Sequence, residues 1–179
     1  MLPKGFILPE TQGNYMRFKP GENRFRIMSD YIVGMEYWTV KNDKRTPVRI
    51  HMDEKMNPDD LQFTDQSPKH FWACTVYDYA DSKIKILEIT QKGLMRTLTG
   101  LENDEDWGDP KGSGGYDLVV IKTGEKMETK YELRAKPKHE LDPGLIKMYE
   151  DMNINLNALY EGDDPFESID VDEVVKALS

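Results

Sequence analysis

Apolar and polar residues alternate along several stretches of the chain. In residues 24–28 apolar side chains alternate with arginines, and residues 31–40 continue in β-branched and aromatic residues. A period of two is typical of strands that bury one face. We expect residues 24–40 to form one long strand that bends at Gly34, because glycine inside a strand permits a bulge or a sharp bend.

Two hairpins and a helix are predicted farther along. Residues 71–79 and 83–90 are rich in aromatic and β-branched residues and flank a polar turn. Residues 116–122 and 129–136 form a second pair of this kind. Between the two hairpins, leucines from position 94 to position 101 recur at helical spacing. The predicted order is therefore long strand, loop, hairpin, helix, hairpin.

This order predicts a mainly β fold, the five-stranded Greek-key OB-fold barrel, with a helix between strands 3 and 4. Residues 41–69 then form the loop between strands 1 and 2, and residues 123–128 form the loop between strands 4 and 5. These two loops flank the nucleic-acid groove in this fold. An SH3-like barrel or a small α+β domain also fits the pattern.

The chain divides into three regions. Residues 1–20 are punctuated by proline and glycine and are expected to form a loosely tied arm, and residues 21–140 are the predicted OB-fold domain. Residues 141–179 form a C-terminal helical segment and an acidic tail. In this region Asp142, followed by proline, predicts a helix start, and residues 171–178 have the spacing of a short amphipathic helix.

Charge is distributed unevenly over the 179 residues. The chain holds 24 Lys/Arg and 33 Asp/Glu residues, which gives a net charge of −9. Residues 141–179 contain 2 of the basic and 10 of the acidic residues, so their net charge is −8 and that of residues 1–140 is −1. Acidic tails are usually interaction or solubilising segments. We expect this one to bind partner proteins through Asp163, Asp164, Phe166, Asp170, Asp172 and Glu173.

Metal sites, disulfides and membrane spans are not expected. The single cysteine, Cys74, excludes an internal disulfide and a Cys-rich zinc site. On a strand, His70 and Cys74 would lie about 13 Å apart, which is too far for one ion. No apolar run approaches the roughly 20 residues of a membrane helix, and the N-terminus lacks a signal-peptide pattern. We therefore expect a cytoplasmic protein with no cofactor.

No catalytic motif stands out, so the chain is not expected to be an enzyme. A metal nuclease, which needs carboxylates and a lysine around a divalent ion, is a distant alternative. Its candidate residues would be Asp59, Asp60, Glu88 and Lys92. A non-catalytic interaction module that acts through the acidic tail is a closer alternative.

Basic and aromatic residues favour single-stranded DNA as the ligand. Proteins that bind single strands combine a basic groove for the backbone with aromatic faces on which bases stack. Here aromatic residues adjoin the basic stretch 41–49 and the strand after it, and lysines surround the second predicted loop. The predicted contact residues are Arg24, Arg26, Tyr37, Trp38, Lys41, Lys44, Arg45, Arg49, Phe71, Tyr77, Tyr79, Lys122, Lys126, Lys130 and Arg134.

Alternation in residues 71–79 divides that strand into two faces. Trp72, Cys74 and Val76 form the predicted core face. Tyr77 and Tyr79 share the opposite face, which we expect to be exposed for stacking.

Several short segments occur in an order typical of one family. They are residues 34–38, 69–73, 76–77, 86–91, 106–110, 116–117, 129–131, 154–156 and 164–166. In these segments the chain resembles single-stranded DNA-binding proteins of OB-fold type from bacteriophages and prophages. The resemblance covers about residues 20–166. It implies sequence-independent coating of single-stranded DNA during replication, recombination and repair in the bacterial host cytoplasm, without catalysis. Some relatives carry a Cys/His zinc site whose ligands this chain lacks.

Overall fold

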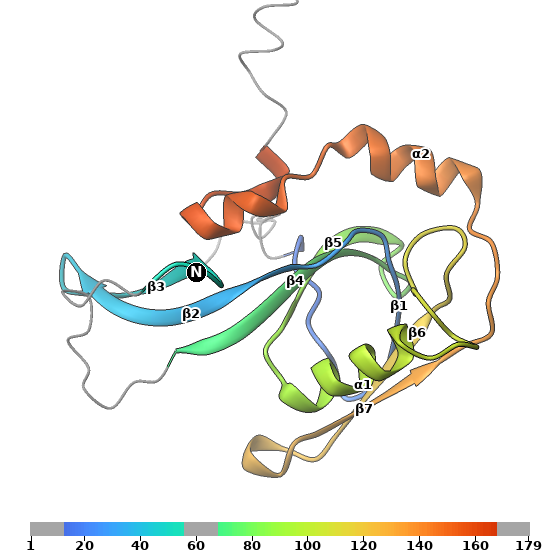
Figure 1. Cartoon of the computed structure of the whole chain (residues 1–179), viewed down its shortest axis with the longest axis horizontal. Coiled ribbons are helices and arrows are strands. Elements are labelled where there is room, and N and C mark those ends of the chain that lie inside the picture. Colours follow the sequence, from blue (N-terminus) through green and yellow to red (C-terminus); the bar gives the residue numbers. More distant parts are fainter. Residues whose placement is uncertain (1–12, 56–67, 168–179) are drawn as a thin grey trace, which may run out of the picture.

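Seven strands of the described residues form one antiparallel sheet (Figure 1). The computed structural model describes residues 13–55 and 68–167. The sheet order is β3-β2-β4-β1-β6-β7, and β5 pairs with the other side of β4. The mainly β prediction is therefore confirmed. The strands are β1 (Gly21–Ile27), β2 (Ile32–Lys41), β3 (Lys44–His51), β4 (Lys69–Asp78), β5 (Lys83–Ile89), β6 (Leu118–Thr123) and β7 (Lys130–Ala135).

β1 and β2 together correspond to the predicted long first strand. Both pair antiparallel with β4, with Ile27 opposite Val76 and Ile32 opposite Ala73. Between them the Oγ of Ser29 accepts a hydrogen bond from the Thr75 amide at 2.9 Å, which continues the attachment to β4. The interruption therefore falls at residues 28–31, whereas the predicted bend at Gly34 lies within β2.

The prediction of a long loop over residues 41–69 is wrong for its first part, because residues 44–51 form strand β3. β2 and β3 form a hairpin whose turn residues Asn42 and Asp43 have φ values of 51° and 62°. Two successive positive φ values are typical of the tight type I′ hairpin turn. Lys44, Arg45 and Arg49 consequently lie on a two-stranded ribbon that projects from the sheet (Figure 1). Residues 56–67 lie outside the described residues.

The main core lies between the inner face of the sheet and helix α1 (Lys92–Glu102). This helix follows β5 and precedes β6, as predicted. Its residues Leu94 and Leu98 are buried against Cys74 and Val76 of β4, which confirms these two as core residues. Trp72 packs only partly buried against the same cluster.

Part of the predicted N-terminal arm is held firmly by the sheet. The Met16 amide donates to the Ile86 carbonyl at 2.8 Å, and the Ile86 amide donates to the Asn14 carbonyl at 2.8 Å. Met16 is buried, and Phe18 packs against the main core. The expectation of a loosely tied arm is therefore wrong for these residues, because they pair with β5. Residues 1–12 lie outside the described residues.

The C-terminal region covers the outer face of the sheet, on the side opposite α1 (Figure 1). Helix α2 (Pro143–Met152) begins after Asp142, whose Oδ1 accepts a hydrogen bond from the Gly144 amide at 2.8 Å, which confirms the predicted start. The 3-10 helices η4 (Leu156–Glu161) and η5 (Pro165–Glu167) follow. They pack on Ala73 and Ile86, so that β4 and β5 are buried on both faces.

Gly34 provides a test of this packing. A Cβ at Gly34 would lie 2.4 Å from the Ile50 carbonyl oxygen and 2.8 Å from Phe71 Cε1. We expect Gly34→Ala to lower the free energy of unfolding by about 1–3 kcal/mol, because the backbone of β3 must move.

The matched control is Gly93→Ala, since among the described residues no atom lies within 4 Å of a Cβ placed there. This variant should gain roughly 0.5–1 kcal/mol from the better helix former in α1. Thermal unfolding measures both changes. Equal melting temperatures for the two variants would contradict the close contact at Gly34.

Candidate nucleic-acid interface

Three of the predicted DNA-contacting side chains are buried. Arg26, Tyr37 and Phe71 expose 0%, 2% and 1% of their surface. For these residues the predicted contact is wrong, because a ring or guanidinium without exposed surface cannot meet a base or phosphate. Phe71 lies against the ring of Tyr160, with centroids 6.0 Å apart, so the C-terminal region removes it from the surface.

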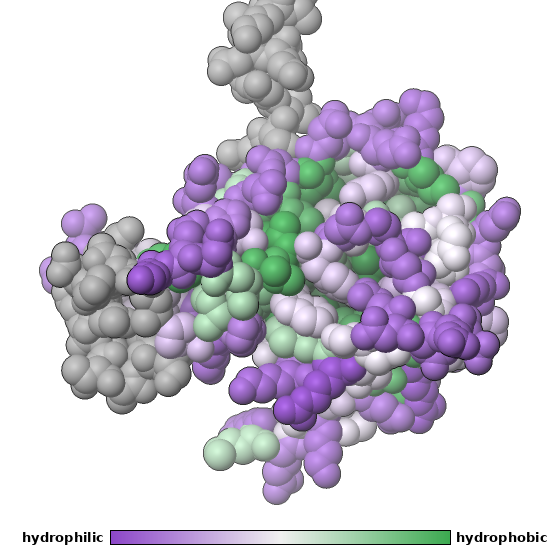
Figure 2. All heavy atoms as spheres, in the orientation of Figure 1, coloured by the Kyte–Doolittle hydropathy of each residue, from purple (hydrophilic) through white to green (hydrophobic). Residues whose placement is uncertain are grey.

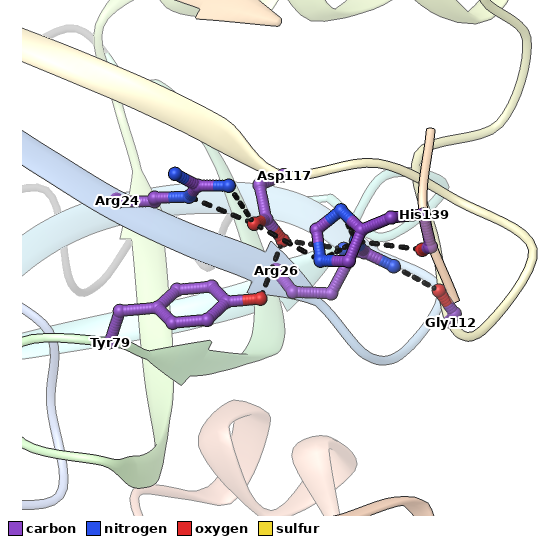
Figure 3. Close-up of polar contacts among 6 residues, drawn as sticks. All are labelled: Arg24, Arg26, Tyr79, Gly112, Asp117 and His139. Atoms are coloured by element: carbon purple, nitrogen blue, oxygen red, sulfur yellow. Dashed lines mark hydrogen bonds and ion pairs between the residues drawn. The ribbon is translucent and has the colours of Figure 1, made fainter. Parts of the chain in front are cut away.

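Arg26 belongs to a polar network centred on Asp117 (Figure 3). The fully buried carboxylate accepts hydrogen bonds from Arg26 Nε at 2.8 Å, Tyr79 Oη at 2.8 Å and Arg24 Nε at 2.9 Å. A buried charge is costly unless it is paired and hydrogen-bonded. Here two guanidinium groups and one hydroxyl satisfy it. Asp117 falls within the predicted strand 116–122 and within one segment of the family resemblance, but neither assigns it a role, because its partners Arg24 and Arg26 lie 93 and 91 residues away in the chain.

The remaining contacts of Arg26 join segments that are distant in the sequence. Its Nη1 donates to the Gly112 carbonyl at 2.9 Å, and its Nη2 donates to the His139 carbonyl at 3.2 Å. The same Nη2 lies 3.2 Å from both ring nitrogens of His139 (Figure 3). Arg26 therefore ties β1 to the loop before β6 and to the chain after β7, which is a structural role.

Arg24 and Tyr79 form the accessible part of this network. The Arg24 guanidinium lies 5.4 Å from the centre of the Tyr79 ring, and its side chain is 46% exposed. The strand register places Arg24, Val119 and Arg134 in one row across β1, β6 and β7. Tyr79 also contacts Tyr77 edge-on, with centroids 5.0 Å apart. We call Arg24, Tyr77, Tyr79 and Arg134 the β1 patch.

A second basic and aromatic surface lies on the β2–β3 ribbon. The Arg45 guanidinium lies 5.1 Å from the centre of the Trp38 ring. Lys44 and Arg45 are exposed and Trp38 is half-buried. We call these three residues the ribbon patch. The side chain of Lys41 lies outside the described part of the structure.

Arg49 differs from its neighbours on the ribbon. It pairs with Glu36 at 2.9 Å and with Glu88 at 2.8 Å, and its guanidinium lies 5.1 Å from the Phe71 ring centre. Burial acts to lower the pKa of Arg49, but the two carboxylates outweigh it and raise that pKa. Arg49 is therefore paired with two carboxylates and only 18% of its side chain is exposed, which weakens its case as a phosphate contact. Arg24 and Arg134 are also paired, with Asp117 and Glu132, but 46% and 59% of their side chains are exposed.

The second predicted loop is the exposed end of the β6–β7 hairpin. Lys126 and Lys130 are exposed there, and Met127 between them is fully exposed. Lys126 begins the short 3-10 helix η3 (Lys126–Glu128). Lys122 is half-buried, and its Nζ donates to the Phe18 carbonyl at 3.4 Å. This hairpin end therefore presents two accessible lysines.

The structure keeps the two patches apart. Glu36 of β2 lies opposite Lys69 at one end of β4, and Tyr79 follows Asp78 at the other end. A ten-residue strand spans about 33 Å. The C-terminal region runs between the two patches, and Figure 2 shows a strip of hydrophobic residues where it meets the sheet.

The predicted tail contacts are only partly described. Asp163 is exposed, while Phe166 packs partly buried against the cluster of Ala73, Ile86 and Leu159. For Phe166 the predicted partner contact conflicts with this packing, because its ring helps to cover the chain's own sheet. Asp170, Asp172 and Glu173 lie outside the described residues.

Other kinds of site find little support in the described ranges. Those residues contain no group of three or more His, Cys, Asp or Glu side chains that would hold a metal ion. Cys74 is fully buried, and burial raises the pKa of its thiol. No helix within these ranges has the length and apolar character that a membrane crossing requires.

Comparison with known proteins adds no relative. No protein-family model matches the chain, and no curated protein matches it significantly.

Tyr79 tests the energetics of the network. Removing its hydroxyl in Tyr79→Phe leaves the buried Asp117 carboxylate with one donor fewer, and we expect a loss of about 1.5–3 kcal/mol of stability. Tyr77→Phe is the control, because the Tyr77 hydroxyl makes no hydrogen bond within the described part of the structure. Urea unfolding at neutral pH measures both, and equal midpoints would contradict the network.

The same hydrogen bond has a defined pH dependence. Burial, together with the hydrogen bond to Asp117, raises the pKa of Tyr79 to about 12 from its ordinary value of 10.0. A raised pKa in the fold means that the protonated hydroxyl stabilises the native state below pH 10. The stability difference between wild type and Tyr79→Phe should therefore persist up to pH 10 and decline as the pH rises toward 12.

Proposed function

We propose that this protein binds single-stranded DNA without sequence preference, through the ribbon patch, the β1 patch and the end of the β6–β7 hairpin. The observation that carries the proposal is the same in both patches. An arginine lies over a partly exposed aromatic ring, at 5.1 Å for Arg45 and Trp38 and at 5.4 Å for Arg24 and Tyr79. Such pairs offer a stacking face for a base beside a cation for the adjacent phosphate.

We propose also that the sheet is of the OB-fold type. Strand order β5-β4-β1-β6-β7 with α1 between β5 and β6 supports this assignment. The β2–β3 ribbon then extends the loop between the first two strands of the fold. Complete closure would need β5 and β7 to pair, and within the described residues the sheet stays open at that point. A partly open barrel is common in this fold.

The biological setting follows from the resemblance noted in the sequence. A protein that coats single strands without reading their sequence serves phage DNA replication, recombination and repair, and it needs no catalytic step. The acidic residues after position 162 are the proposed contact for partner proteins of these processes.

Salt dependence of binding tests the ribbon patch. Affinity for oligo-dT should fall with salt, with a slope near −0.7 per phosphate contact. We expect Lys44→Glu combined with Arg45→Glu to reduce this slope by about 0.7 for each phosphate that the ribbon no longer neutralises. Quenching of tryptophan fluorescence, followed between low and moderate salt, gives the affinities.

The control pair, Lys92→Glu with Arg96→Glu, makes the same charge change on α1, on the opposite side of the sheet. This pair should retain the wild-type slope. Equal salt slopes for the two double variants would show that the ribbon patch does not contact DNA. Absence of oligo-dT binding by the wild-type protein at low salt would refute the proposed function.

A further inference from the structure

Helix α2 is held loosely on the outer face of the sheet. None of its ten described residues is buried, and Met148 is 42% exposed. Its apolar stripe is only partly buried against the cluster of Met28, Ile84 and Leu141, on which Tyr77 also packs; the stripe consists of Leu145, Ile146, Tyr149 and Met152. One side-chain hydrogen bond joins it to β4, from Thr75 Oγ1 to Tyr149 Oη at 3.1 Å.

The neighbouring helix η4 is held much more firmly. Ala158 and Leu159 are buried. Tyr160 Oη donates to the Val33 carbonyl at 2.6 Å, and the Tyr160 ring stacks on His51 with centroids 3.7 Å apart. Within the C-terminal region, α2 is therefore the part that separates from the sheet at the lowest cost.

The surface beneath α2 continues the β1 patch. Tyr77 packs against the same buried cluster as α2, and its ring contacts that of Tyr79 with centroids 5.0 Å apart. Arg24 is exposed, and Tyr77 and Tyr79 are half-buried. Tyr77 lies on the same face of β4 as Thr75, whose hydroxyl donates to Tyr149 of α2. A strand of DNA that stacks on Tyr79 and extends along β4 would meet α2 at the next aromatic residue.

We propose that α2 is a displaceable cover over a cryptic part of the DNA-binding surface, and that single-stranded DNA stacks on Tyr77 as it displaces the helix. The inference rests on the proposed function. A ten-residue helix is marginal in water on its own, so displaced α2 unfolds. The helix itself is acidic, with Glu150 and Asp151 against Lys147 and with Asp142 as its N-cap, so DNA phosphates also repel it.

The experiment weakens the helix without touching its apolar contacts. Asp142→Ala and Asp142→Asn both remove the same exposed charge, but only asparagine keeps a side-chain oxygen that caps the helix. Loss of the cap favours the displaced state. We expect the alanine variant to bind oligo-dT about fivefold more tightly than the asparagine variant, because the competent state is more populated.

Hydrogen exchange on wild type supplies an independent measurement. Amides of α2 should exchange faster when oligo-dT is bound, while those of α1 do not. Equal affinities of the two Asp142 variants, or α2 amides that exchange no faster with DNA, would overturn the cover alone. Failure of all three proteins to bind oligo-dT would overturn the proposed function and the cover with it.

Discussion

The apolar outer face of β4 and β5 is the constraint on which the rest of the structure depends. Ala73, Ile84 and Ile86 lie on this face, and exposed apolar surface costs about 25 cal/mol per Å². The chain covers the face with its own C-terminal region, and Gly34 leaves room for Tyr160 to reach it. The C-terminal region covers the middle of this face, and the ribbon patch and the β1 patch lie toward its two ends.

Carboxylates determine which basic side chains remain available to a ligand. Arg26 is enclosed with Asp117, and Arg49 is shared between Glu36 and Glu88. These arginines hold strands together. On the two hairpins, the side chains of Lys44, Arg45, Lys126 and Lys130 are exposed. A nearly neutral body therefore still presents local positive surfaces, and such local fields govern the encounter with a polyanion more than net charge does.

Local pattern predicted the elements, and long-range packing determined which predicted contacts are accessible. Alternation located the strands, leucine spacing located α1, and Asp142 marked the start of α2. The β2–β3 hairpin escaped prediction because its Asn-Asp turn lies in a charged stretch that resembles a loop. Burial of Arg26 depends on Asp117, 91 residues away. Alternation of apolar and polar residues shows which residues share a face of a strand, but it does not show what covers that face. It therefore could not predict that Tyr160 of the C-terminal region covers Phe71.

Salt would act differently on DNA and on helix α2, which in the proposed mechanism compete for the surface beneath α2. Phosphate contacts weaken as salt rises, because the release of counterions from DNA then contributes less free energy. Docking of α2 depends mainly on apolar side chains around Met28 and Ile84, and burial of apolar surface does not weaken in this way. In the proposed competition, docking of α2 would therefore become more favourable relative to DNA binding as salt increases, and the repulsion between α2 and the phosphates would be screened at the same time. A cover of this composition makes the site more sensitive to ionic strength than its phosphate contacts alone would.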